Sequence, residues 1–359
     1  MAKKYALTLK QKPSMKKTFD RRNFIKSTAL AGIGLGLNFT GPSVFGKENT
    51  PVQTGKRIGI IGLDTSHSTA FTKTFNDANA GPEYGGYKVV AAYPKGSNDI
   101  ESSLKRIPGY IEEVKKDGVK IVDSIKDLLS EVDVVLLETN DGRLHLEQVI
   151  PVFKAGKTVF IDKPMAAFLP DVIAIFKEAK KYNVPVFSSS SLRYAPTVQA
   201  IASGKAGKVL GADVFSPSHL EKTHLDFSWY GIHGVEMLFT MMGLGCKSVT
   251  RTHTADSDVV VGVWGDNRIG TFRGIRFKKS GYGGSVYGEN SIEPLDGEGG
   301  YNPLLVEVVK FFQSGKSPVT PEETMEIFAF MEAADESKRQ GGKTVTLESV
   351  MQKAKAAIK

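Results

Sequence analysis

Residues 159–164 read Val-Phe-Ile-Asp-Lys-Pro. The apolar run predicts a short buried strand, and the proline ends it because proline lacks a backbone N–H and disfavours a continuing ladder. Lys163 therefore lies at the carboxyl end of the predicted strand, directly after Asp162. Open parallel sheets bind their ligands at these ends, so Lys163 is a candidate functional residue. The alternative is a strand end with a solvated lysine.

Around this strand, apolar runs alternate with helical patterns. Near-continuous apolar strands separated by helices are typical of a parallel sheet that is covered on both faces. The predicted strands are residues 57–62, 88–92, 119–123, 132–137 and 158–161, and the predicted helices are residues 70–79, 110–117, 124–130, 142–155 and 171–182. The predicted fold class is therefore α/β, with a doubly wound, Rossmann-like domain over residues 47–194.

The chain changes character after about residue 195. Most predicted strands here follow one another without crossover helices, which predicts an open, mostly antiparallel sheet. The strands are residues 209–215, 248–253, 259–264 and 268–273, a turn or loop is expected at 281–284, and helices are predicted over 303–314 and 321–340. Residues 195–359 are thus expected to form an α+β domain whose C-terminal helix packs back on the first domain.

Residues 1–46 have the layout of an export signal. Asp-Arg-Arg-Asn-Phe-Ile-Lys at 20–26 precedes a Gly/Ala/Leu-rich apolar run at 27–39. That run is shorter than the roughly 20 residues of a membrane span. The paired arginines resemble a twin-arginine signal. We therefore expect export to the periplasm without stable membrane insertion after processing; an ordinary first helix is the alternative.

The net charge of the chain resides in this N-terminal segment. Residues 1–46 hold nine Lys/Arg and one Asp, which accounts for the formal net charge of +8, and residues 47–359 hold 38 basic and 38 acidic residues. The mature domain therefore offers no net basic field for nucleic acid. Cys246 is the only cysteine, which excludes an intrachain disulfide and a thiolate metal cluster.

The Asp162-Lys163-Pro164 stretch closely resembles the Glu-Lys-Pro signature of the glucose-fructose oxidoreductase/inositol dehydrogenase (Gfo/Idh/MocA) family, with Asp162 in place of the usual glutamate. The resemblance extends over residues 57–345. It implies a nicotinamide cofactor, with Asp162 and Lys163 beside it and Lys163 also beside the substrate hydroxyl. It also implies a second domain whose open sheet commonly supports oligomers, and hence a homo-oligomer.

The predicted cofactor loop departs from the family pattern. The family has Gly-x-Gly-x-x-Gly, whereas this chain reads Gly62-Leu-Asp-Thr-Ser-His67, with Asp64 at the second glycine. Asp64, Thr65 and Ser66 are all suitable helix N-caps, so we expect Asp64 to turn away and cap the helix. The helix N-terminus then remains an anion site. The alternatives are loss of the cofactor, or a loop in which Asp64 and His67 join the substrate or a metal.

Three further residues are candidate cofactor contacts. Lys95 follows the second strand, where Lys95 and Ser97 could hold a 2′-phosphate, which favours NADP over NAD; a turn with a solvated lysine is the alternative. Asn140 follows the fourth strand, and the resemblance implies a contact with the nicotinamide ribose. Arg193 falls in a turn that resembles the family's Arg-aromatic-x-Pro segment. It contacts the cofactor or substrate, or it staples the two domains together.

A second group of candidate residues is Trp-Tyr-Gly-Ile-His-Gly-Val-Glu at 229–236. It resembles the family's Asp-x-x-x-His-x-x-Asp segment at the start of a helix. Residues three apart share a helix face, so His233 and Glu236 are expected in one cleft, with Glu236 favouring the protonated imidazole. His233 suits acid–base catalysis, and Tyr230 could stack on a sugar ring. A core histidine is the alternative.

Metal ligands are not expected, although His and acidic residues crowd this part of the sequence. The spacings match no known short zinc motif, and the resembled family needs no metal. The crowded residues are His219, His224, Asp226, His233 and Glu236.

These features lead to one expected function and two alternatives. We expect an exported NAD(P)-dependent oxidoreductase that transfers a hydride between a sugar or sugar-like alcohol and a tightly held cofactor. The first alternative is a glycosidase that acts through transient oxidation at C3 with a recycled NAD. The second is a cofactor-free sugar-binding protein on the same fold, which Asp64 would permit.

Overall fold

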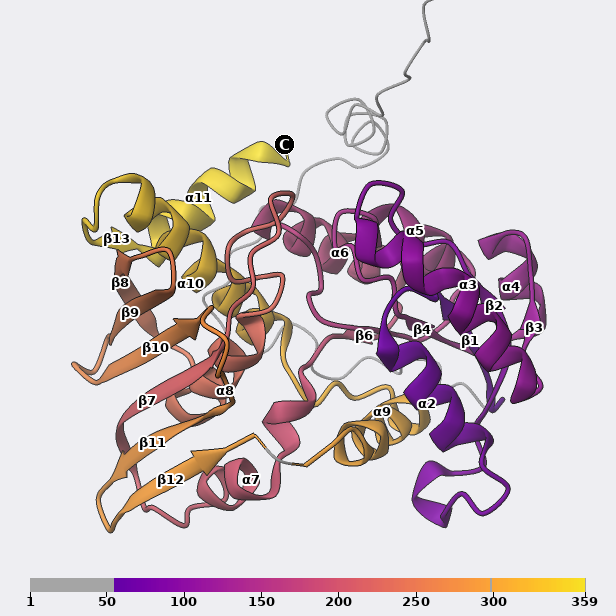
Figure 1. Cartoon of the computed structure of the whole chain (residues 1–359), viewed down its shortest axis with the longest axis horizontal. Coiled ribbons are helices and arrows are strands. Elements are labelled where there is room, and N and C mark those ends of the chain that lie inside the picture. The colour runs from indigo at the N-terminus through magenta and orange to yellow at the C-terminus, as the bar shows by residue number, and fades with distance from the viewer. Residues whose placement is uncertain (1–54, 298, 359) are drawn as a thin grey trace, which may run out of the picture. The chain divides into compact units, whose positions relative to one another are not determined.

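The computed structural model describes residues 55–297 and 299–358, so the predicted export signal lies outside the described residues. The first sheet has six parallel strands in the order β3-β2-β1-β4-β5-β6 (Figure 1). Its strands are β1 (Arg57–Ile61), β2 (Lys88–Tyr93), β3 (Lys120–Ile121), β4 (Val134–Leu137), β5 (Val159–Ile161) and β6 (Val186–Phe187). This is the strand order of a Rossmann-like domain, so the predicted fold class is confirmed.

Helices cover both faces of this sheet, as Figure 1 shows. They are α2 (Ser66–Asn76), α3 (Glu101–Lys116), α4 (Ile125–Glu131), α5 (His145–Lys154) and α6 (Leu169–Tyr182), with 3₁₀ turns η1 (Pro82–Tyr84) and η2 (Ser191–Tyr194). The predicted helices exist, but three begin well away from the predicted residue. Helix α3 begins nine residues before the prediction. Helix α2 begins four residues before the prediction because Thr65 caps it. Helix α5 begins three residues later than predicted, since residues 142–144 form a turn.

The strand order reverses between β1 and β4, which opens a crevice at the carboxyl ends of these two strands. The loops that leave them approach closely. Gly62 has φ +91°, and a Cβ there would lie 2.5 Å from the backbone nitrogen of Thr139. Only glycine meets both demands without strain, which explains why the first glycine of the loop is present.

The second sheet has seven strands in the order β12-β11-β7-β10-β9-β8-β13. They are β7 (Val209–Pro217), β8 (Cys246–His253), β9 (Ser257–Trp264), β10 (Ile269–Ile275), β11 (Gly283–Gly288), β12 (Ile292–Asp296) and β13 (Val345–Thr346). Every pair is antiparallel except β7 and β10, which run parallel. The mostly antiparallel prediction is therefore confirmed.

The hairpin of β11 and β12 was not predicted, and the turn expected at 281–284 ends inside β11. Its glycines conceal the strand, because they leave no apolar alternation. They are needed where the backbones crowd: a Cβ on Gly284 would lie 2.1 Å from the carbonyl oxygen of Asp213 in β7.

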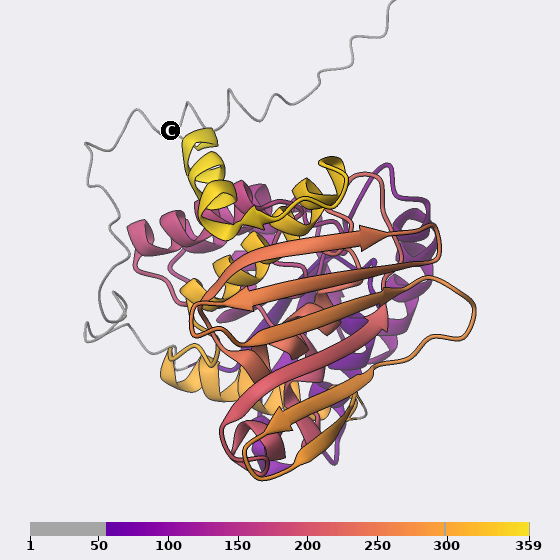
Figure 2. The same ribbon diagram turned by 90° about the vertical axis from the view of Figure 1, so that its left-hand side faces the viewer.

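One face of the second sheet carries helices, and the other has no described helix over it (Figure 2). Helices α8 (Ile232–Met242) and α10 (Pro321–Arg339) pack on the covered face, and α10 and α11 (Leu347–Ala357) also contact α6. The remaining helices are α7 (Pro196–Ala202) and α9 (Asn302–Ser314). Although α9 follows the second sheet's strands, its apolar side chains complete the core beneath β1 and α2.

Among residues 55–297 and 299–358, no helix has both the length and the apolar character that a bilayer span requires.

Candidate active site

Three segments that are distant in sequence meet at the carboxyl ends of β1, β4 and β5. His67 lies in the first turn of α2, Glu138 follows β4, and Asp162 and Lys163 follow β5. His67 Nδ1 lies 2.8 Å from Asp162 Oδ2, and Lys163 Nζ lies 4.0 Å from the same oxygen. All four side chains are buried. We call His67, Glu138, Asp162 and Lys163 the strand-end cluster.

The carboxylate oxygens of this cluster are only partly hydrogen-bonded. Glu138 is fully buried, and neither of its carboxylate oxygens has a hydrogen-bond partner among the described residues; Asp162 Oδ1 likewise has none. Burial raises the pKa of Glu138 well above its ordinary value, and the nearby Asp162 adds to the rise. Burial also opposes ionisation of Asp162, but His67 and Lys163 hold its pKa below the ordinary value. Burial and the neighbouring acid thus favour the neutral form of Glu138, whereas His67 and Lys163 favour the charged form of Asp162.

Sequence analysis did not select Glu138 as a site residue. A usable indication was present, because a carboxylate directly after the fully apolar strand β4 must emerge at the edge where the strand order reverses.

His233 approaches this edge from α8. Its Nδ1 lies 2.7 Å from the Ser190 hydroxyl. Burial lowers the pKa of His233 well below its ordinary value, and the positive charges of Lys163 and His67 lower it further. The imidazole is therefore neutral near pH 7 and suited to accept a proton. This differs from the expectation of a protonated imidazole.

Glu236 makes no hydrogen bond with His233, so it does not favour the protonated imidazole in the way expected from the sequence. Its carboxylate accepts hydrogen bonds from Ser189 Oγ at 2.5 Å, Ser190 N at 2.8 Å and Arg193 Nε at 2.8 Å. Arg193 Nη2 also lies 2.5 Å from Glu323 of α10. The buried guanidinium is thus held between two acids, which matches the stapling alternative for Arg193 rather than a cofactor contact.

Aromatic side chains from the second half of the chain surround His233. Tyr230 packs edge-on against His233 with ring centroids 5.4 Å apart, and Tyr282 does the same at 5.9 Å. The hydroxyl of Tyr282 donates to that of Tyr230 at 3.2 Å. His219 packs edge-on against Tyr230 with ring centroids 5.2 Å apart. Tyr282 lies in the segment expected to be only a turn, so its place beside His233 was missed.

Asp64 turns away from α2, but it does not cap the helix. Thr65 is the cap, since its hydroxyl accepts from the backbone N–H of His67 at 3.4 Å. Asp64 is fully buried, with Oδ1 accepting from Asn140 N at 2.9 Å and Oδ2 from Ser97 N at 3.3 Å. The prediction of Asp64 as cap is therefore wrong, because two neighbouring loops supply its donors.

The crevice fits a dinucleotide in two respects. The Gly62 turn allows close approach of backbone, and the first turn of α2 contains no acidic side chain. Its N-terminal dipole therefore still favours an anion. The Ser66 side chain is exposed at this end, whereas the Asp64 carboxylate is occupied by backbone donors on the far side of the loop.

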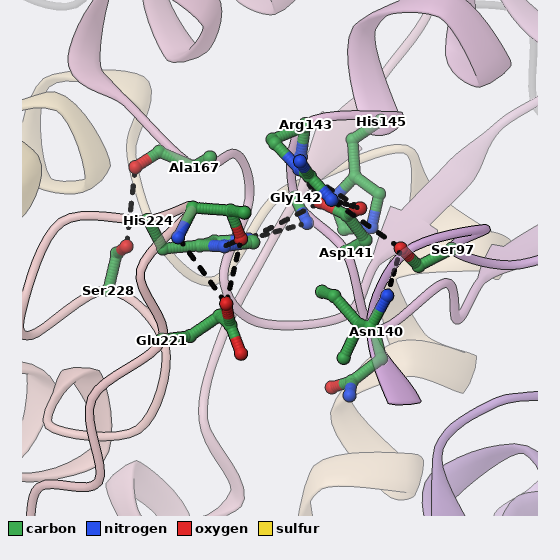
Figure 3. A network of polar contacts seen from close by, with 12 residues as sticks. Ser97, Asn140, Asp141, Gly142, Arg143, His145, Ala167, Glu221, His224 and Ser228 are labelled. Atoms are coloured by element: carbon green, nitrogen blue, oxygen red, sulfur yellow. Dashed lines mark hydrogen bonds and ion pairs between the residues drawn. The ribbon is translucent and has the colours of Figure 1, made fainter. Parts of the chain in front are cut away.

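The remaining predicted contacts lie around the ends of β2 and β4. Lys95 is exposed, whereas the Ser97 hydroxyl already donates to Asp99 at 2.9 Å. Figure 3 shows how Arg143 approaches Ser97 and how the backbone N–H of Gly142 donates to His224 Nε2, at 3.1 Å. This network holds the loop after β4, which includes Asn140.

Three of the five His and acidic residues that crowd 219–236 occupy different networks. His224 contacts Gly142, Asp226 pairs with Arg251 and Lys338, and Glu236 pairs with Arg193. Sequence proximity therefore does not translate into a common ligand set.

Residues 56–190 match the GFO_IDH_MocA family model, described as an oxidoreductase family with an NAD-binding Rossmann fold. The resemblance expected from the sequence is thus confirmed over this part of the chain. The 1,5-anhydro-D-fructose reductase of Ensifer adhaerens is 32% identical over 138 residues, which are 35% of this chain and 40% of that protein. The myo-inositol 2-dehydrogenase of Thermotoga maritima is 29% identical over 159 residues, 42% of each chain. The chain spans less than half the length of these relatives.

Solved structures match a larger part of the chain. A probable dehydrogenase from Thermotoga maritima superposes with a TM-score of 0.66 at 23% identity, over 82% of this chain and 99% of that one. A scyllo-inositol dehydrogenase from Lactobacillus casei, solved with bound NAD(H) and scyllo-inositol, superposes with a TM-score of 0.62 at 14% identity, over 81% and 99%. At these identities the likeness establishes the two-sheet fold.

Proposed function

We propose that this chain is a Gfo/Idh/MocA-family oxidoreductase that transfers a hydride between a sugar-like alcohol and a tightly held nicotinamide cofactor. The observation that carries the proposal is that His233 of α8 lies close enough to Lys163, at the end of β5, for the ammonium charge to help burial lower its pKa and keep the imidazole neutral. The family match over residues 56–190 and the sugar-related names of two relatives support it.

The two residues divide the proton chemistry. His233 accepts the proton of the substrate hydroxyl, because burial keeps its imidazole unprotonated. Lys163 stabilises the negative charge that develops on the same oxygen, and a positioned cation of this kind acts strongly in a buried site. Tyr230 and Tyr282 provide an aromatic wall on which a sugar ring can pack.

The cofactor would lie at the switch point of the first sheet, with its diphosphate at the N-terminus of α2 near Gly62 and Ser66, and its nicotinamide ribose near Asn140. When bound, it accepts the hydride from the carbon that bears the hydroxyl. Lys95, exposed at the end of β2, is available to a 2′-phosphate. We therefore propose NADP before NAD.

Export to the periplasm by the twin-arginine route is part of the proposal. Free nicotinamide cofactor is not expected there, so the cofactor must be held through many turnovers. Replacing both Arg21 and Arg22 with lysine should leave precursor in the cytoplasm. Unchanged appearance of processed protein in the periplasmic fraction would show that another route is used.

We also propose that the uncovered face of the second sheet forms a homo-oligomer. Five large apolar side chains are exposed along it, which is more than a scatter of single residues. They are Phe215, Val263, Ile269, Tyr287 and Ile292. Ile269, 53% exposed, is the residue to test: Ile269→Glu should lower the mass measured by light scattering, and an unchanged mass would place the interface elsewhere.

The enzymatic proposal is tested by the small molecule that the protein carries and by the product that it forms. We expect denaturation of the purified protein to release NAD or NADP, identified by absorbance and mass, and incubation with glucosides to give a keto-sugar. Free sugar would instead indicate the glycosidase that recycles its cofactor. If no dinucleotide is released and none binds in a calorimetric titration, the oxidoreductase is rejected in favour of a sugar-binding protein.

A further inference from the structure

The strand-end cluster contains more acceptor oxygens than the chain has donors for. Both oxygens of Glu138 and Oδ1 of Asp162 are buried without a partner among the described residues. A buried polar atom without a hydrogen bond costs about 1–3 kcal/mol, and more when it is charged. Three such atoms in one place are unusual in a core whose polar groups are normally paired.

The neighbouring Lys163 and His67 side chains do not supply the missing hydrogen bonds. Lys163 Nζ stays 4.0 Å from Asp162 Oδ2, beyond hydrogen-bond distance, and His67 contacts only that same oxygen. Glu138 therefore faces Asp162 with no donor of its own. A small ligand that carries positive charge would give these buried carboxylates the partner that the described residues do not supply.

We propose that His67, Glu138 and Asp162 bind a divalent transition-metal cation. One ligand atom from each residue lies within 4.8 Å of the others, and all three residues are buried. Two carboxylates and one imidazole are ligands that Mn²⁺ and Zn²⁺ accept. Three protein ligands leave coordination positions open, as in catalytic metal sites, for water or a ligand oxygen.

The imidazole is held in place for this role. The ring of Phe71 stacks on His67 with centroids 5.4 Å apart, and Tyr301 packs edge-on at 4.7 Å. Packing that fixes a ligand ring favours metal binding because the geometry need not be organised on binding.

Short spacing motifs could not reveal this site. The intervals between His67, Glu138 and Asp162 are 71 and 24 residues, and only the parallel sheet brings the three strand ends together. The residues differ from the crowded segment 219–236 in which a metal was considered and not expected. The inference does not depend on the oxidoreductase proposal, since it concerns occupancy rather than turnover.

The test measures metal directly on the full chain. We expect mass spectrometry of the purified protein to find about one transition-metal ion per chain, and calorimetry of chelator-treated protein to give saturable binding of Zn²⁺ or Mn²⁺. Glu138→Gln and His67→Gln should each weaken that binding at least tenfold, since even loss of an outer-shell partner commonly costs 10–100-fold. With Co²⁺ as probe, the visible absorption of a coordinated ion should disappear in both variants.

His253→Gln is the matched control. His253 Nδ1 lies 2.6 Å from Asp258 Oδ1, a histidine–aspartate pair like that of His67 and Asp162, but Asp258 is also bound by Arg251 and Arg276. This variant should bind the cation like the wild type. Circular dichroism checks the fold of each variant. If both cluster variants fail to fold, the wild-type titration decides: no saturable binding overturns the proposal, as does binding that neither variant weakens.

Discussion

Two buried clusters of charged residues in this protein differ in how completely their acids are paired. Around Arg251, whose side chain is fully buried, the guanidinium bonds to Asp258 and Asp335 at 2.8 and 2.6 Å and to Asp226 at 2.6 Å. Further side chains reach the same acids: Arg276 and His253 contact Asp258, and Lys338 contacts Asp226. In the strand-end cluster, by contrast, three carboxylate oxygens have no partner among the described residues.

The difference separates a structural cluster from a binding cluster. Buried acids whose charges are matched by the chain itself tie β8, β9 and α10 together and need nothing from outside. Buried acids that are left unmatched are costly to fold, and such a cost is typical of sites that await a ligand. Each cluster contains one central cation, so removing Lys163 or Arg251 should have different consequences.

Lys163→Ala should have the largest effect, and on turnover rather than on folding. Loss of a positioned group in proton transfer commonly reduces the rate by roughly 10²–10⁴-fold. Steady-state kinetics with the substrate found for the wild type measure this loss. The urea midpoint serves as control and should fall less than in Arg251→Met, since Lys163 Nζ lies 4.0 Å from Asp162 and makes no hydrogen bond to it. Near-normal turnover would remove Lys163 from the mechanism.

Arg251→Met should act on stability. Removing one partner of a buried ion pair costs about 3–5 kcal/mol, and here three acids lose their shared cation together with the stacking of the guanidinium on Phe227 at 4.2 Å. Urea unfolding measures the change. Arg57→Met is the control: the Arg57 side chain is 56% exposed beside Asp133, and exposed pairs contribute about 1 kcal/mol or less. Equal losses of unfolding free energy in Arg251→Met and Arg57→Met would contradict the structural role of the Arg251 cluster.

Asp64→Asn tests a third buried acid, whose partners are backbone N–H groups. An amide retains one acceptor oxygen, so either Ser97 N or Asn140 N loses its bond. One unsatisfied buried donor costs about 1–3 kcal/mol, to be measured by urea unfolding. Affinity for NAD or NADP should hold, because the carboxylate does not cap α2. A selective loss of dinucleotide affinity at unchanged stability would contradict this geometry.

The smallest expected effect concerns the pH dependence of kcat/KM. Its acid limb, the fall in activity at low pH, should be displaced. A proton acceptor must be unprotonated, so activity falls as the pH drops through the pKa of His233. Burial and the charges of Lys163 and His67 lower that pKa well below 6.5, so the limb should lie below the ordinary histidine range. His233→Gln should abolish it. A wild-type limb at or above pH 6.5 would show that another group is titrating.

The first sheet could be predicted because each buried parallel strand corresponds to a short run of apolar residues in the sequence. Lys163 could be placed for the same reason, as the strand that precedes it and Pro164 that follows it define a strand end. Contacts between residues that are far apart in the sequence were harder to predict. The i, i+3 spacing puts His233 and Glu236 on one helix face, but it cannot show that Ser189 and Arg193, more than 40 residues earlier, occupy the carboxylate.

Contacts between residues that are distant in sequence also explain other errors of the sequence-based predictions. Asp64 is a good cap by its chemistry, yet the donors that it meets come from loops after β2 and β4. Glu138 follows an apolar strand, which marks it as a strand-end acid, but only the fold shows that His67 and Asp162 lie beside it. The β11–β12 hairpin escaped prediction because its glycines leave no apolar alternation. Helix α11 was also not predicted, although its buried residues Leu347, Val350 and Ala354 recur at helical spacing.

The ion pairs of Arg193 also bear on how a substrate enters. Arg193 lies in η2, in the segment between the two sheets, and is clamped to α8 through Glu236 and to α10 through Glu323. A hinge rotation at this joint would break a buried pair at about 3–5 kcal/mol, so an opened form would be populated at less than about one molecule in a hundred. Entry should therefore proceed through nanosecond-to-microsecond movements of loops at the crevice mouth, such as the one that carries Tyr282, rather than through a swing of one half against the other.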